Sequence, residues 1–192
     1  MKKLFLLVAS LFSFALSNAQ VTLYIDAAHG GNDVGATAID GSKESALCLQ
    51  LAQLVAQKAK EQNVKVVMIR EKDEFIPLTD RSIKTDNTHP SYFVSIHMNS
   101  SEDKAKKGAT IIMQKGNQLD GTLLLSRKMI HQFSQIGIVN LEQLNLEVLR
   151  NNTIPSVAVS AGYLSNETDL MNLKSAKFQE QIAAAIIKAI TE

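Results

Sequence analysis

Apolar and polar positions along this chain follow two periods, one typical of strands and one typical of helices. The clearest helical stripe consists of Leu47, Leu51, Leu54 and Val55, which share one face at helical spacing. The clearest strand is the β-branched run that begins at Val64. We expect strands at 21–26, 64–70, 92–97, 110–114, 146–150 and 157–161, and helices at 43–60, 79–84, 123–133 and 174–190.

Strands and helices alternate from one end of this pattern to the other. Such alternation predicts an α/β domain with a mixed, mostly parallel sheet flanked by helices. The chain has 192 residues, a length that suits one domain, and no Pro/Ser-rich linker or repeat divides it. We therefore expect a single α/β domain.

The first 19 residues do not fit this domain. Lys2 and Lys3 precede an apolar run at 4–16, and Ala19 ends a small-residue cleavage site. This order is typical of a secretory signal peptide. A membrane anchor is the alternative, but the run is shorter than the roughly 20 apolar residues that span a bilayer. We expect residues 1–19 to be removed, 20–192 to form the domain, and the protein to be secreted or periplasmic without a membrane anchor.

Composition excludes several classes of protein. A net charge of +1 gives no general reason to expect a nucleic-acid partner, and without Trp an aromatic stacking platform is not expected. Cys48 is the single cysteine, so an internal disulfide is impossible. An exported chain of this kind must rely on its core, or on a metal, for stability.

Three potential metal ligands stand at the ends of the expected elements. His29 follows the first strand, His97 ends the strand at 92–97, and Glu44 shares the inward face of the first helix. Two histidines and a glutamate with an open fourth position are typical of catalytic zinc. Alternatively, the histidines have separate partners and Glu44 is a solvated acid at a helix start. Residue types and spacing alone leave both interpretations open.

Short motifs lie at 25–36, 43–44, 70–87, 95–100, 148–150 and 155–166. In their residues and their order, they resemble the motifs of the zinc-dependent N-acetylmuramoyl-L-alanine amidases of the type-3 family. The resemblance implies the fold of that family and His29, Glu44 and His97 as ligands of Zn²⁺. It also implies hydrolysis of the amide that joins the lactyl group of N-acetylmuramic acid to L-alanine in peptidoglycan.

Position 160 departs from the family pattern. The resemblance places a catalytic Glu there, which takes a proton from the zinc-activated water and passes it to the leaving amine, but this chain has Ser160. A serine without an adjacent base is a poor proton acceptor. One expectation is an amidase of weak activity, or an inactive zinc- and peptidoglycan-binding pseudo-amidase that regulates cell-wall turnover, with a protein partner unknown. The other is that Glu147 or Glu167 supplies the proton transfer.

Two arginines and the cysteine also require an interpretation. Arg70 and Arg81 match family positions, and we expect them to pair with Asp73 or Asp80 rather than to contact substrate. Cys48 is expected to be a small buried hydrophobic residue.

Overall fold

The computed structural model describes residues 20–83, 91–116 and 120–192. Within them lies a six-stranded sheet of order β2-β1-β3-β6-β4-β5. All neighbours pair in parallel except β4 and β6, which are antiparallel, so the expected mixed, mostly parallel sheet is confirmed. The strands are β1 (Thr22–Ala27), β2 (Lys65–Met68), β3 (Ser91–Asn99), β4 (Ala109–Gln114), β5 (Val139–Leu144) and β6 (Ser156–Tyr163).

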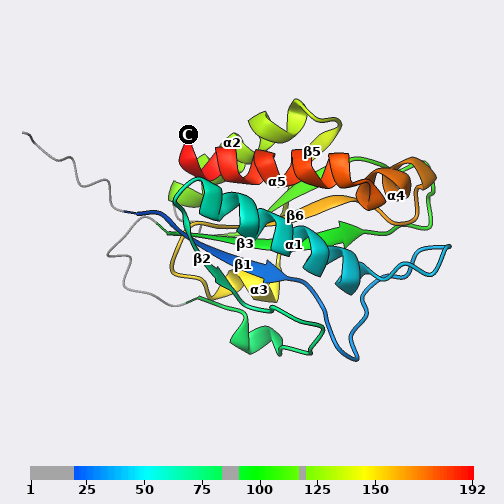
Figure 1. Ribbon diagram of the computed structural model, residues 1–192, viewed down its shortest axis with the longest axis horizontal. Helices are drawn as coiled ribbons and strands as arrows, with labels where there is room; N and C mark the ends of the chain where they lie inside the picture. Colours follow the sequence, from blue (N-terminus) through cyan, green and yellow to red (C-terminus); the bar gives the residue numbers. More distant parts are fainter. Residues whose placement is uncertain (1–19, 84–90, 117–119) are drawn as a thin grey trace, which may run out of the picture.

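Helices cover the two faces of this sheet unequally (Figure 1). The larger core lies beneath α1 (Glu44–Glu61), α2 (Asp120–Ser134) and α5 (Ala176–Thr191), with α4 (Glu167–Lys174) at its edge. The opposite face carries α3 (Glu147–Arg150) and a 3-10 turn (Leu78–Asp80) over a smaller core. The smaller core consists of Phe93, Ile112, Val148, Leu149, Ile154 and Ala158.

Helix α1 forms where the apolar stripe predicts it. Leu47, Leu51 and Val55 are buried against the sheet, and full burial of each such side chain contributes about 1.5–3 kcal/mol. Glu44 stands in its first turn, where the helix dipole favours an anion. Cys48 is fully buried, as expected, and burial raises the pKa of its thiol.

One expectation about the elements was wrong, and two elements were not expected. The segment at 146–150 is the short helix α3, in which the amides of Leu149 and Arg150 both donate to the carbonyl of Leu146. An apolar run this short cannot distinguish a strand from a helical turn. The strand β5 was not expected, because most of its side chains are exposed at the sheet edge. The C-terminal helix expected at 174–190 is confirmed as α5, whereas α4, which ends just before it, was not expected.

A capping signal for α4 is present in the sequence. The Asn166 side chain accepts a hydrogen bond from the amide of Asp169, as an N-cap residue does. The helix expected at 79–84 is shorter and lies at Leu78–Asp80. Residue 84 of the expected helix, the 84–87 part of the family-like segment and the expected leader lie outside the described residues. In the described part of the chain, no helix has the length and apolarity that crossing a membrane requires.

Candidate metal centre and cleft

His29 occupies a strained turn immediately after β1. Its φ is +60°, a left-handed conformation that costs a residue with a Cβ about 1–2 kcal/mol. Arg81 Nη2 donates to the His29 carbonyl at 2.8 Å, and Arg70 Nη2 donates to the Ala28 carbonyl at 3.0 Å. The guanidinium groups are buried, so these bonds are shielded from water. The turn is therefore fixed from both sides by arginines.

Of the two arginines, Arg70 pairs with an expected carboxylate and Arg81 does not. Arg81 Nη1 lies 2.7 Å from Asp26 Oδ1 in a buried ion pair, so the expectation that it pairs with Asp73 or Asp80 was wrong. Asp26 Oδ2 also accepts a hydrogen bond from Ser95 Oγ at 2.6 Å. Arg70 Nη1 lies 4.0 Å from Asp73, and its shorter contacts are to backbone carbonyls. Both side chains hold the loop after β1.

Glu44 is buried although it is a charged residue. Its Oε1 accepts from the Met98 amide at 3.0 Å, and its Oε2 accepts from the Ala36 amide at 2.9 Å. Burial alone would raise the pKa of this carboxyl. Hydrogen bonds from His29, His97 and the two amides outweigh burial, so its pKa lies well below the usual value. Glu44 is therefore an anion throughout the neutral range.

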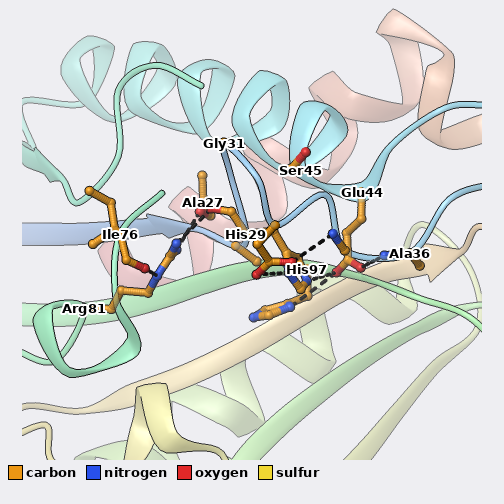
Figure 2. Close-up of polar contacts among 12 residues, drawn as sticks. Ala27, His29, Gly31, Ala36, Glu44, Ser45, Ile76, Arg81 and His97 are labelled. Carbon is orange, nitrogen blue, oxygen red and sulfur yellow. Dashed lines mark hydrogen bonds and ion pairs between the residues drawn. The ribbon is translucent and has the colours of Figure 1, made fainter. Parts of the chain in front are cut away.

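Figure 2 shows His29, Glu44 and His97 pointing toward one another from the loop after β1, the start of α1 and the end of β3. Glu44 Oε1 lies 3.2 Å from His29 Nε2 and 3.4 Å from His97 Nδ1. The two imidazole rings meet edge to face, with centroids 5.6 Å apart. The structure thus brings together the three residues that the sequence singled out.

These spacings fit a tetrahedral metal ion. Two atoms that each bind one zinc at about 2.0–2.1 Å lie about 3.3–3.4 Å apart. The ligand atoms of His29, Glu44 and His97 all lie within 4.8 Å of one another. Imidazole nitrogen together with carboxylate oxygen is a donor set that suits Zn²⁺. The three residues could therefore hold a metal and leave a fourth position open.

Asp33 orients the first histidine of this set. Its Oδ2 lies 2.9 Å from His29 Nδ1, so Nε2 faces Glu44. The hydrogen bond to Glu44, with help from Asp33 and against burial, raises the pKa of His29 to about 9 in the metal-free protein. The sequence analysis did not single out Asp33, although its position four residues after His29 was an available signal.

Gly35 allows the ligands to approach this closely. A Cβ at this position would lie 2.6 Å from His29 Cδ2 and 2.7 Å from Glu44 Oε2, and the φ of +66° also favours glycine. Any larger residue at position 35 would displace the ligands.

A cavity of about 330 Å³ opens beside the histidines, on the face of the sheet covered by α3. His29 and His97 line one wall, and Phe75, Leu78 and Glu147 line others. Phe75 and Leu78 are more than half exposed, so this wall offers an apolar surface to solvent. The cavity is large enough for part of a small polar polymer.

The structure places the other three candidate residues, Ser160, Glu147 and Glu167, in different surroundings. Ser160 is the register partner of His97 on the neighbouring strand β6, so both side chains point to the same face of the sheet, and Ser160 is buried. Glu147 lines the cavity of the histidines. Glu167 lines a separate cavity of about 440 Å³ together with Ile39 and Lys104.

The fold is that of an α/β domain, and His29, Glu44 and His97 form a group that could hold a metal ion. The chain matches the family of N-acetylmuramoyl-L-alanine amidases over residues 23–192, and it therefore belongs to that family. Its fold is that of solved amidase catalytic domains. The family and fold implied by the resemblance are therefore confirmed.

Individual relatives agree with this membership. The chain is similar to the catalytic domain of the amidase CwlV from Bacillus (Paenibacillus) polymyxa var. colistinus, with 30% identity, TM-score 0.80, and coverage of 90% of this chain and 96% of that one. It is also similar to the N-acetylmuramoyl-L-alanine amidase of Clostridium difficile 630, with 29% identity, TM-score 0.83, and coverage of 91% of this chain and 96% of that one. The probable cell wall amidase LytH of Staphylococcus saprophyticus is 31% identical over 88% of this chain, which spans only 57% of LytH.

Proposed function

We propose that this chain is an exported, zinc-dependent peptidoglycan hydrolase that cleaves the amide between the lactyl group of N-acetylmuramic acid and L-alanine. The observation that carries the proposal is the convergence of His29 Nε2, His97 Nδ1 and Glu44 Oε1 at distances suited to one tetrahedral zinc. Membership in the amidase family supplies the substrate class. The leader-like residues 1–19 support a secreted or periplasmic location.

The charge of Glu44 and the orientation of His29 both favour a cation at this site. Glu44 is already ionised, and Asp33 holds His29 with Nε2 directed at the site. Bound at these three residues, zinc supplies a Lewis acid and a water whose pKa is about 7. The exposed side chains of Phe75 and Leu78 line the same cavity and offer an apolar surface to the methyl groups of the lactyl and alanyl units.

Ser160 limits the rate in this proposal unless another carboxylate moves the proton. Its hydroxyl is neutral at physiological pH and stands beside His97 where the family resemblance places a carboxylate. Loss of a positioned general base lowers a rate by about 10²- to 10⁴-fold. The second candidate function follows from the same observation: an inactive pseudo-amidase that binds zinc and peptidoglycan and acts through a partner protein.

Digestion of purified sacculi by the chain lacking residues 1–19, followed by mass spectrometry, distinguishes the two functions. We expect free stem peptides that begin with L-alanine, and no release after chelation of zinc. The pseudo-amidase predicts pelleting with sacculi without release. A Ser160→Glu variant that binds zinc is expected to release peptides faster than the natural chain. Release that a chelator does not affect would contradict the proposed zinc dependence.

A further inference from the structure

Hydrolysis of an amide requires a group that moves a proton from water to the departing nitrogen. Three carboxylates line the cavity beside His29 and His97, namely Asp26, Asp33 and Glu147. Histidines that bind a metal cannot also exchange protons through the same nitrogen. The candidates for proton transfer at this cavity are therefore its carboxylates.

Two of the three carboxylates already have fixed partners. Asp26 is buried and holds Arg81 through Oδ1 and Ser95 through Oδ2. Asp33 holds His29 through Oδ2 and the Gly35 amide through Oδ1. Release of either would leave a buried guanidinium or a metal ligand without its partner. Neither carboxylate can leave its place to follow a proton.

Glu147 has the freedom that the other two lack. It is the first residue of α3, and its Oε2 lies 2.8 Å from Arg150 Nη1. The side chains of this pair are 38% and 53% exposed, and an exposed pair of this kind contributes only about 0–1 kcal/mol. Glu147 can therefore change rotamer toward a bound amide at small cost.

The backbone beneath Glu147 is nevertheless fixed. Val148 and Leu149 are buried in the smaller core together with Phe93 and Ala158 of β3 and β6. Phe93 lies four residues before His97, and Ala158 lies two before Ser160, so α3 covers the sheet face on which His97 and Ser160 stand. Glu167 lies at the start of α4 and lines the other cavity.

We infer, given the proposed hydrolysis, that Glu147 is the catalytic acid–base residue of this chain and replaces the carboxylate absent at position 160. Its carboxylate accepts a proton from the attacking water as the new C–O bond forms. It then donates that proton to the amide nitrogen as the C–N bond breaks. The products are a lactyl carboxylate and the free amino group of L-alanine, and Glu147 returns to its ionised form.

Glu147→Gln tests this role, with Glu167→Gln as the matched control, because both residues begin a helix and only Glu147 lines the histidine cavity. We expect Glu147→Gln to release stem peptides about 10²- to 10⁴-fold more slowly, with zinc content and pelleting with sacculi unchanged. Glu167→Gln is expected to match the natural chain. In Glu147→Ala, added formate is expected to restore part of the rate, since a small carboxylate fits the vacated volume.

The outcomes separate this inference from the proposed function. If the natural chain releases peptides in a zinc-dependent manner and Glu147→Gln does so equally fast, only the role of Glu147 is overturned. If the natural chain is inactive and Ser160→Glu is active, the role of Glu147 is overturned while the metal site and cleft stand. If loss of activity in Glu147→Gln is accompanied by loss of zinc, and formate restores nothing to Glu147→Ala, Glu147 is structural and the inference is wrong.

Discussion

On the β1 side of the cleft, each functional side chain is held by several short polar contacts. On the α3 side, apolar packing holds the helix, but the exposed functional side chain has few contacts of its own. Glu44 receives two backbone amides in addition to its contacts with the histidines, and His29 is held at its ring by Asp33 and at its carbonyl by Arg81. Glu147 has one exposed ion pair, with Arg150.

This difference separates two requirements of the same reaction. A metal ion needs its ligands at set distances, so the β1 side stores strain at His29 and stabilises it with buried arginines. Proton transfer needs a carboxylate that can follow the reacting atoms. The α3 side can therefore accept a different donor residue without disturbing the ligands, and the ligand side cannot.

The largest effect is expected from loss of a ligand on the β1 side. His97→Ala leaves two protein ligands in place of three, so zinc affinity should fall by more than the roughly 10- to 100-fold that follows loss of a ligand's hydrogen-bond partner. Metal analysis of the purified variant should show no zinc where the natural chain retains about one per chain. Unchanged occupancy would refute the ligand assignment.

The next effect concerns the buried ion pair beneath the turn. Arg81→Met leaves Asp26 charged and buried without its partner, which should lower the free energy of unfolding by about 3–5 kcal/mol. Arg150→Met, on the α3 side, is the control and should change it by only about 0–1 kcal/mol. Urea unfolding measures both. If both variants lose the same free energy of unfolding, the contrast between the β1 side and the α3 side of the cleft is wrong.

A smaller effect is expected at the residue that orients His29. Asp33→Ala removes the acceptor for His29 Nδ1 and should weaken zinc binding by about 10- to 100-fold, with the fold retained. Competition with a chromogenic chelator measures the affinity. If the variant binds zinc as tightly as the natural chain, the Glu44 contact alone fixes the ring.

The last expected effect is a dependence of zinc binding on pH. The raised pKa of about 9 means that metal-free His29 is protonated at neutral pH, and zinc must displace that proton. Affinity should therefore rise with pH by about tenfold per unit until about pH 9. Calorimetry in two buffers of different protonation enthalpy should show about one proton released per zinc. Asp33→Ala should release less, because Asp33 helps to raise this pKa.

Much of the ligand side could be predicted from the sequence, because its residues stand at the ends of strongly patterned elements. The stripe of α1 placed Glu44 on the inward face, and strand period placed His97 at a carboxyl end. The long-range contacts that hold the turn after β1 could not be predicted. Asp26 and Arg81 are 55 positions apart, and only the fold makes them partners.

The α3 side was less predictable for a physical reason. The segment at 146–150 is too short for its period to separate strand from helix, and its helix depends on packing of Val148 and Leu149 against the sheet. From the sequence, Glu147 and Glu167 are equal candidates for the proton transfer. The structure separates them by placing each in a different cavity.

By itself, then, the sequence determined the α/β class, the family resemblance and the three candidate ligands, since these depend on local periodicity and on residue types in order. The tertiary structure decided the distances from Glu44 to the two histidines, the partners of the buried arginines and the location of Glu147 above the sheet face of Ser160. Those properties depend on which strands become neighbours, and long-range packing sets that arrangement.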